Sequence, residues 1–253
     1  ASLRPNLMNL NIKREELLIS QLVDLLKNDN HVAVGAASPI PGAAALLAKE
    51  EAKNFNKRLR VTILHSNKYN NFTDGARELF DCAAQGRIDT FFLGGVQIDG
   101  KANINLVGTG EYPNLKKRFP GSFGSPLMYF VVPQVILFRE EHSPRTLVKN
   151  VDFISAPGVS EDNIYRPGGP KYLLTNRALF KFDKKQKKFS LLRLNINETL
   201  DSIIELTGFN FEVDKNLSQM VLPEKNRIET LRKYIAPMVS EFYPEFAKRI
   251  WGV

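Results

Sequence analysis

Sulfur and long apolar runs are scarce in this sequence. Its 253 residues include one cysteine, Cys82, which excludes an intrachain disulfide and a cysteine-based zinc site. The longest apolar stretches are too short to span a bilayer. Near the start, Arg4, Asn6 and Asn9 stand where a signal peptide would need an apolar core. We therefore expect a cytoplasmic protein that is not inserted in a membrane.

Acidic residues are outnumbered by basic ones, 27 against 35, and the formal net charge is +8. Such an excess suits nucleic acid or an anionic ligand such as a phosphate-bearing cofactor. The basic residues are scattered along the chain, and their densest run, residues 181–188, is typical of a hairpin tip between two strands. We therefore expect no nucleic-acid partner. The length and the 43% hydrophobic content predict one α/β domain over residues 1–253.

Apolar periodicity predicts the order of the elements. A leucine-rich helix over 13–27, a strand over 31–35 and an alanine-rich helix over 43–53 form an opening helix–strand–helix unit. Further strands are expected at 60–64, 88–93, 103–107, 135–139 and 151–155, with helices at 75–85 and 126–132. This alternation predicts an open, doubly wound, mainly parallel sheet.

The last third of the chain has a different pattern. Residues 172–175, 178–182 and 189–194 are typical of antiparallel strands joined by turns. Asn197 is the expected cap of a helix over 198–206, and two amphipathic helices are expected over 224–234 and 237–251. The predicted sheet thus has an antiparallel extension and C-terminal helices.

Three loops rich in glycine or small residues are candidate ligand sites: 35–42, 94–95 and 121–125. Ligands bind at the carboxyl ends of the strands in an open α/β sheet, and glycine lets backbone N–H groups approach an anion. Neither a Walker loop nor a dinucleotide fingerprint is present, because no Gly–Lys–Ser/Thr follows and the third glycine is missing. Taken alone, the composition of each loop is equally typical of an ordinary tight turn.

The order of the motifs resembles the beta subunits of class I, glutaconate-type CoA-transferases. Residues 92–99 are FLGGVQID, 103–105 are NIN and 118–125 are RFPGSFGS, similar to the Gly–Gly–x–Gln–Ile–Asp, Gly–Asn–x–Asn and Gly–Ser–x–Gly motifs of that group. Ala102 stands where the group usually has glycine. Similar segments at 34–41, 149–158 and 207–209 extend the resemblance over about residues 14 to 250.

The resemblance implies a sheet of the CoA-transferase type and an alpha subunit of the same superfamily as partner, in a heterodimer or heterotetramer. It implies an acyl-CoA substrate, with coenzyme A as part of the substrate and no bound cofactor. Lys116, Lys117 and Arg118 are candidates for its phosphates. The residues implied for substrate and CoA binding are Ser38, Ile40, Gly94, Gly95, Gln97, Asn103, Asn105, Gly121, Ser122, Phe123, Gly124 and Ser125.

One catalytic feature of that group is missing. In its transferases the strand matching 61–64 ends in Glu–Ser–Gly, and the glutamate becomes a glutamyl-CoA thioester. Here the positions hold His65, Ser66 and Asn67, with no acidic residue between Glu51 and Asp74. A hydrolase branch, acting on cyclic ketone CoA thioesters in steroid-ring degradation, lacks the same glutamate. The resemblance therefore favours a hydrolase-like reaction, by ring opening or thioester hydrolysis. CoA transfer with a nucleophile from elsewhere and a non-catalytic acyl-CoA-binding subunit stay open.

His65 and Ser66 are the candidate catalytic residues. Because an imidazole titrates near neutral pH, His65 can serve as a general base on water. A purely structural role, as a polar residue that ends a strand, is equally compatible with the sequence. His142 follows Glu140 and Glu141, but a third metal ligand is missing from this spacing. We expect no metal site, and we expect His142 at the surface or at a subunit interface.

Overall fold

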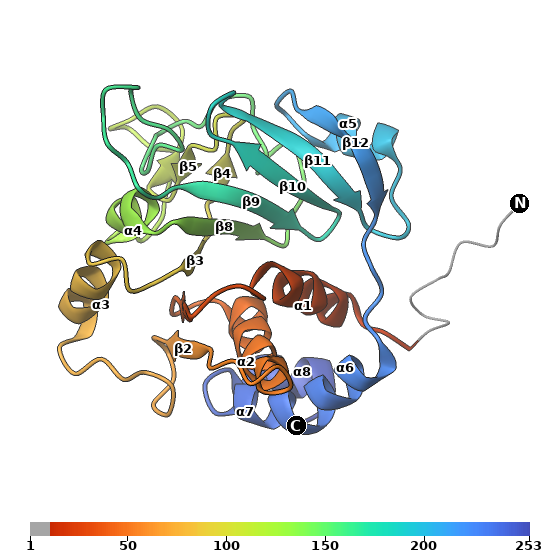
Figure 1. Cartoon of the computed structure of the whole chain (residues 1–253). Coiled ribbons are helices and arrows are strands. Elements are labelled where there is room, and N and C mark those ends of the chain that lie inside the picture. Colours follow the sequence, from red (N-terminus) through yellow and green to blue (C-terminus); the bar gives the residue numbers. More distant parts are fainter. Residues whose placement is uncertain (1–10) are drawn as a thin grey trace, which may run out of the picture.

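The computed structural model describes residues 11–253, and its centre is an eight-stranded sheet with the strand order β12-β11-β10-β9-β8-β3-β1-β2 (Figure 1). Residues 1–10, which carried the expectation about a signal peptide, lie outside the described residues. The parallel strands are β1 (His31–Val34), β2 (Arg60–Ile63), β3 (Thr90–Leu93), β8 (Gln134–Arg139) and β9 (Pro170–Thr175).

The sheet continues through β10 (Ala178–Asp183) and β11 (Lys188–Leu194), which pair antiparallel, and ends in β12 (Glu212–Gln219), parallel to β11. Residues 184–187 form the β10–β11 turn, as their charge predicted. The predicted mainly parallel sheet with an antiparallel extension is confirmed. β12 was not predicted, because most of its residues are polar and exposed, and an edge strand needs no apolar pattern.

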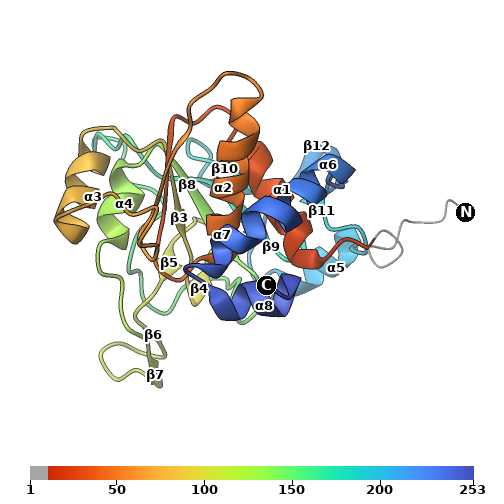
Figure 2. The same cartoon turned by 90° about the horizontal axis from the view of Figure 1, so that it is seen from below.

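Alternate side chains of the central strands enter two separate cores. In β3, Phe92 packs on the same face as α1 (Arg14–Leu25) and α2 (Pro39–Lys53), whereas Phe91 and Leu93 pack on the opposite face. That opposite face is covered by α3 (Gly75–Ala84) and α4 (Ser125–Val131), which contact each other (Figure 2). Because successive side chains of a strand point to opposite faces, both faces of the sheet carry apolar residues, and helices cover both of them.

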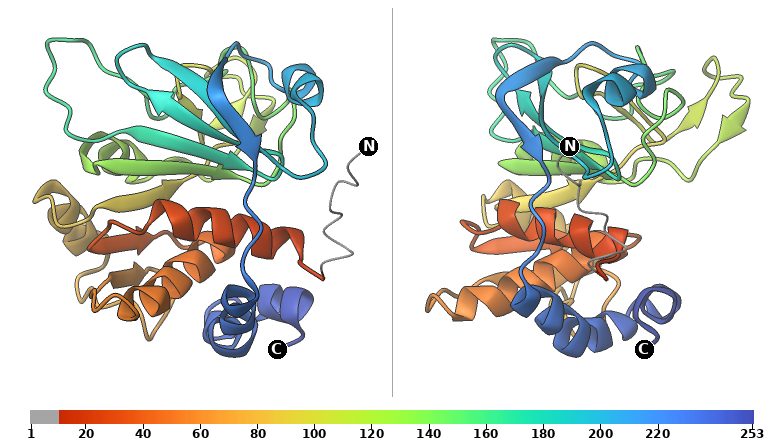
Figure 3. Two further views of the ribbon diagram at one scale, coloured as in Figure 1. Left: turned by 45° about the vertical axis from the view of Figure 1, so that its right-hand side comes forward. Right: turned by 90° about the vertical axis from the view of Figure 1, so that its right-hand side faces the viewer.

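The C-terminal helices return to the α1–α2 face. After α5 (Leu200–Leu206) and β12 the chain runs down the side of the molecule to α6 (Lys225–Thr230), a π-helical turn (Leu231–Ile235), α7 (Ala236–Ser240) and α8 (Pro244–Trp251) (Figure 3). Arg227 holds this segment by binding both oxygens of Glu51, at 2.7 and 2.8 Å. Arg232 binds the fully buried Glu16 of α1 in the same bidentate way. Of the helices in residues 11–253, none is long and apolar enough to cross a membrane.

Two short hairpins stand beside the sheet: β4 (Gln97–Ile98) with β5 (Ile104–Asn105), and β6 (Gly108–Thr109) with β7 (Lys117–Arg118). The β6–β7 hairpin projects from the body of the molecule (Figure 2). It carries Lys117 and Arg118, and both are exposed.

Several expected elements differ in the structure: the helix expected over 237–251 is divided into α7 and α8, and the strand expected over 103–107 is reduced to β5. The second helix begins at Pro39 rather than 43, because prolines fit a first helical turn, where the N–H has no intrahelical partner. α5 is capped by Thr199 instead of Asn197, through reciprocal hydrogen bonds with Ser202. Residues 151–155 form no strand, because their N–H groups bond to the β4–β5 hairpin: that of Asp152 to the Gln97 side chain, and that of Ser155 to the carbonyl of Ile104.

His142 was expected at the surface or at a subunit interface, and this prediction is wrong. Its side chain is buried, with Nδ1 2.8 Å from Thr175 Oγ1 and Nε2 2.9 Å from Thr207 Oγ1. Burial lowers the pKa of His142 to about 4. The imidazole therefore joins α5 to β9 as a neutral group.

Candidate functional site

A cleft of about 790 Å³ lies where the carboxyl ends of β1, β2, β3 and β8 meet. Its walls are residues 35–38 after β1, Leu64 after β2, residues 94–96 after β3, and the loop 121–125 with the start of α4. Phe138 and Arg139, at the end of β8, and residues of α3 also line it. This is the edge of an open α/β sheet where ligands bind.

Eight of the twelve residues predicted to bind substrate line this cleft: Ser38, Gly94, Gly95, Gly121, Ser122, Phe123, Gly124 and Ser125. Gly95 has a steric reason to lack a side chain, because a Cβ there would lie 2.8 Å from the carbonyl oxygen of Gln97. The ring of Phe123 is 86% exposed and lies 5.7 Å from that of Phe80, between their centroids. The glycine-rich loops are therefore brought together, as their order in the sequence predicted.

The other four predicted binding residues, Ile40, Gln97, Asn103 and Asn105, do not line the cleft. Ile40 is 1% exposed and packs in the core between α2 and the sheet. Gln97 Oε1 accepts hydrogen bonds from Asn105 Nδ2 at 2.8 Å and from the Asp152 N–H at 2.9 Å. Asn105 also donates to the Gly108 carbonyl at 2.7 Å. Gln97 and Asn105 thus tie together the loops beside the cleft.

Asn103 has a similar role in the turn between β4 and β5. Its backbone and side-chain N–H groups donate to Asp99, and its Oδ1 accepts from the Gly158 N–H at 3.0 Å. Ala102, in this turn, has φ of +59°, a left-handed conformation that explains the glycine usual in the related motif. The two asparagines of the Gly–Asn–x–Asn pattern therefore hold neighbouring loops together by hydrogen bonds.

The turn after β2 is held by the C-terminal segment. Ser66 is buried, and its Oγ donates to Glu241 Oε2 at 2.7 Å while accepting the N–H groups of Lys68 and Tyr69. Glu241 Oε1 accepts the Asn67 N–H at 3.0 Å. The hydroxyl of Ser66 is therefore fully engaged in holding the turn. The carboxylate of Glu241 lies beside residues 65–67, which themselves include no acidic residue.

His65 is exposed on the same turn and stacks on Tyr243, with 5.2 Å between ring centroids and 13° between planes. The Tyr243 hydroxyl donates to the Ala36 carbonyl and accepts the Ser38 N–H at 2.8 Å. Burial raises the pKa of Tyr243, so its hydroxyl stays protonated and able to donate. His65 and Ser66, the predicted catalytic residues, are not among the residues that line the cleft, whereas residues 36 and 38, which Tyr243 contacts, do line it.

Sequence reasoning missed Glu241, Tyr243 and Arg139. The first two gave no local signal, because Glu241 is 175 residues from Ser66 in the chain. Arg139 did have a local signal, because it ends a predicted strand at the edge of the sheet where ligands bind.

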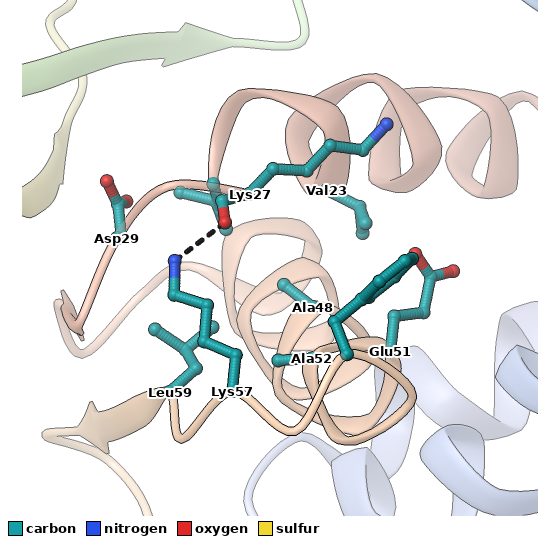
Figure 4. A pocket seen from close by; sticks show the side chains of 10 residues that line it. Val23, Lys27, Asp29, Ala48, Glu51, Ala52, Lys57 and Leu59 are labelled. Carbon is teal, nitrogen blue, oxygen red and sulfur yellow. Dashed lines mark hydrogen bonds between the residues drawn. The ribbon is translucent and has the colours of Figure 1, made fainter.

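A second, smaller cavity of about 290 Å³ lies at the opposite ends of the strands, between α1, α2 and the turn before β2 (Figure 4). Lys57, which lines it, donates to the Lys27 carbonyl, and Asp29 also lines it. Burial, with a smaller effect of the nearby Asp89, raises the pKa of Asp29 to about 6. The described residues include no group of three or more His, Cys, Asp or Glu side chains that could hold a metal ion.

The fold and the cleft together define an α/β protein with a candidate ligand site at the sheet edge, and comparison with known proteins identifies its family. Residues 11–195 match the coenzyme A transferase family model. The chain belongs to the coenzyme A transferase family.

Two relatives support the more specific resemblance. The chain is 29% identical over 153 residues to the beta subunit of glutaconate CoA-transferase from Acidaminococcus fermentans, covering 58% of this chain and 56% of that protein. It is 30% identical over 153 residues to the beta subunit of 3-oxoadipate CoA-transferase from Pseudomonas knackmussii, covering 58% of each. The matches thus span a little over half of these relatives, and the predicted resemblance to beta subunits is confirmed.

Solved structures share the fold over nearly the whole chain. Glutaconate coenzyme A-transferase from Acidaminococcus fermentans has a TM-score of 0.77 at 20% identity, covering 92% of this chain and 97% of that chain. The decarboxylase AibA/AibB has a TM-score of 0.74 at 21% identity, covering 95% and 99%. Rhodococcus jostii RHA1 IpdAB has a TM-score of 0.74 at 20% identity, covering 89% and 95%. At these identities the likeness concerns the fold.

Proposed function

We propose that this chain is the beta subunit of a heteromeric enzyme that acts on an acyl-CoA together with an alpha subunit of the same superfamily. The observation that carries the proposal is the cleft at the carboxyl ends of β1, β2, β3 and β8, walled by the glycine-rich loops. Two relatives are themselves named as single subunits of CoA-transferases, which supports the need for a partner. The exposed ring of Phe123, which lines the cleft, offers such a partner an apolar contact.

The substrate supplies coenzyme A, and no resident cofactor is needed. The backbone N–H groups of residues 121–124 and 94–95 can stabilise a developing oxyanion on the thioester carbonyl. Lys116, Lys117 and Arg118, in the loop and the second strand of the β6–β7 hairpin, can contact the CoA phosphates at the surface.

The reaction that the β2 turn supports best is hydrolysis. In this mechanism His65 takes a proton from water, the hydroxide adds to the thioester carbonyl, and the tetrahedral intermediate expels the CoA thiolate, which receives that proton. Tyr243 orients the imidazole by stacking, and Ser66 holds the turn. If the acyl group bears a ring ketone, the same base can direct water to that carbonyl and cleave a C–C bond.

Glu241 supports a second candidate, CoA transfer. Its carboxylate lies beside the strand end where transferases of this group carry their nucleophile, bound to Ser66 and to the Asn67 N–H. It would attack the thioester carbonyl, form a mixed anhydride and release the CoA thiolate. The thiolate would then attack the glutamyl carbonyl, leaving a glutamyl-CoA thioester and the free acid.

Trapping experiments distinguish the two reactions. The complex with its alpha subunit is incubated with an acyl-CoA, treated with hydroxylamine or borohydride, and digested for mass spectrometry. Hydrolysis predicts free acid and CoA with no adduct on Glu241, and a loss of about 10²–10⁴-fold in kcat for His65→Ala. An adduct on Glu241, absent from Glu241→Gln, would establish transfer instead.

Two further outcomes bear on the subunit role. We expect the isolated chain to have no activity, and robust turnover without an alpha subunit would contradict the need for a partner. Unchanged turnover in the complexes with His65→Ala and with Glu241→Gln would favour a non-catalytic subunit that binds acyl-CoA.

A further inference from the structure

Two positively charged side chains meet at the amino-terminal end of β9, away from the cleft. Gly169 precedes that strand, and a Cβ at this position would lie 3.5 Å from Lys184 Nζ and 3.7 Å from Arg166 Nε. Arg166 belongs to the crossover between β8 and β9, and Lys184 belongs to the β10–β11 turn. None of these residues lines the cleft. Two separate loops therefore bring like charges together over a glycine.

The guanidinium of Arg166 is held in place with one N–H group left over. Nη1 donates to the Pro157 carbonyl at 2.9 Å, and Nη2 donates to the Tyr129 carbonyl at 2.8 Å. The guanidinium carbon lies 5.2 Å from the centroid of the Tyr129 ring. The Nε atom is buried and has no hydrogen-bond partner among the described residues. Because buried donors in folded proteins nearly always have a partner, this N–H calls for an acceptor.

Lys184 is also held by a neutral group. Its Nζ donates to the Gly168 carbonyl at 2.7 Å, and an ammonium has three N–H donors, so further donors remain for a ligand. Burial, with the nearby charge of Arg166, lowers the pKa of Lys184, and burial also lowers the pKa of Arg166. Lys184 is exposed as a whole, so a rotation of its side chain can admit a ligand to the Arg166 Nε.

The acidic side chains of the same two loops are engaged elsewhere. Asp162 is 95% exposed and lies 3.5 Å from the ammonium of Lys187. Asp183 accepts two backbone N–H groups of the β10–β11 turn, at 2.8 and 2.9 Å. Within residues 11–253, neither of the two cations over Gly169 forms an ion pair with a carboxylate. Their combined charge is therefore uncompensated by the chain, and it attracts an anion.

We propose that Arg166 and Lys184 bind a phosphate group over Gly169, at a site separate from the cleft and independent of the proposed acyl-CoA function. A phosphate group carries a charge of about −1.5 to −2 at neutral pH, which matches two cations. One of its oxygens accepts the Nε–H of Arg166, and another accepts from the ammonium of Lys184. A carboxylate fits less well, because it pairs with two parallel N–H groups of a guanidinium, and Nη2 is already bound to the Tyr129 carbonyl.

Calorimetry of the full chain with inorganic phosphate, at low ionic strength, tests the site. Phosphate should bind saturably, with one molecule per chain. Lys184→Gln should raise the dissociation constant by about 10–100-fold, as expected for loss of a charge-assisted hydrogen bond. Lys184→Arg, which keeps the charge, should recover most of the binding. Arg166→Gln should weaken phosphate at least as much, but Arg166 also holds two carbonyls, so the exposed Lys184 gives the variants that keep the fold.

Lys185→Gln is the matched control, because it removes the same charge from an exposed position of the same turn. It should change the dissociation constant by less than about twofold, since exposed charges are screened by water. Equal weakening in Lys184→Gln and Lys185→Gln would show only a general attraction to a chain of net charge +8 and would overturn the site. Absence of saturable binding would overturn it as well.

Two further probes define the ligand. Acetate should compete with phosphate at least about tenfold more weakly than sulfate does, and equal competition by acetate would overturn the phosphate assignment in favour of a carboxylate. Glycerol 3-phosphate separates the two sources of a phosphate group. Binding as tight as that of inorganic phosphate would support the site as one for phosphate monoesters, and much weaker binding would support it as one for free phosphate.

Discussion

Ser66 Oγ donates a hydrogen bond of 2.7 Å to Glu241 Oε2, and this contact joins the turn after β2 to the C-terminal segment between α7 and α8. It makes the C-terminal segment a part of the candidate site. The family match ends at residue 195, well before Glu241 and Tyr243. The residues that support His65 therefore come from outside the matched region.

Ser66→Ala should lower the free energy of unfolding by roughly 1–3 kcal/mol, because it removes three hydrogen bonds of a buried hydroxyl. Urea denaturation of the chain measures this change. Ser122→Ala, a serine of the cleft loop with no side-chain hydrogen bond among the described residues, should change stability by less than about 0.5 kcal/mol. Equal effects of the two substitutions would mean that the Ser66 contacts do not stabilise the turn.

Asp29→Asn should stabilise the chain at alkaline pH. The carboxyl is buried and its pKa is raised from 3.8 to about 6, so folding favours the protonated form. The penalty is absent below about pH 4, grows between about pH 4 and 6, and is complete above about pH 6, where it reaches up to about 3 kcal/mol. Denaturation at about pH 8 should show the gain, and at about pH 4 no gain. Asp162→Asn, a 95% exposed carboxylate, should show no gain at either pH.

His142 gives a pH dependence of the opposite sign. Its pKa falls from 6.5 to about 4 on folding, so the buried ring contributes stability that is fully present above pH 6.5 and is lost as the pH falls toward 4. The loss should reach up to about 3 kcal/mol. Because Asp29 acts in the reverse direction over part of this window, the observable is the difference between the unsubstituted chain and His142→Gln. That difference should decline from about pH 7.5 to about pH 4.5, and a constant difference would contradict a neutral buried imidazole.

Gly158→Ala should destabilise the fold by about 3 kcal/mol or more, at the upper end of overpacking effects. A Cβ at this position would lie 2.1 Å from the Lys101 carbonyl oxygen, in the turn that Asn103 holds. Gly86→Ala is the comparison: φ is +71° there but no atom lies within 4 Å, so the cost should be about 1–2 kcal/mol, from the backbone alone. Thermal or urea denaturation of both variants measures the difference. Equal losses would show that the 99–103 turn yields to the added methyl group.

Local sequence patterns predicted the helices and strands well wherever neighbouring residues alone determine the backbone conformation. The alternation of Val32, Ala33 and Val34 between two cores identifies a central strand, and Gly86, with φ of +71°, directly follows the C-cap of α3. Prediction failed where partners come from elsewhere in the chain. Residues 151–155 have strand-like composition, yet the Asp152 N–H bonds to the Gln97 side chain. The polar strand β12 forms because β11 offers it a free edge.

The same division applies to the site. Sequence alone determined the family, the sheet type and the glycine-rich loops, because each depends on local spacing and on backbone freedom at particular positions. Only the tertiary structure decided that Gln97, Asn103 and Asn105 bond within the framework, that Ser66 is occupied by Glu241, and that Arg139 is the charged residue among those described around the cleft. Each of these contacts joins residues that are far apart in the sequence. They form only when the C-terminal helices pack beside α2 and the strand ends converge.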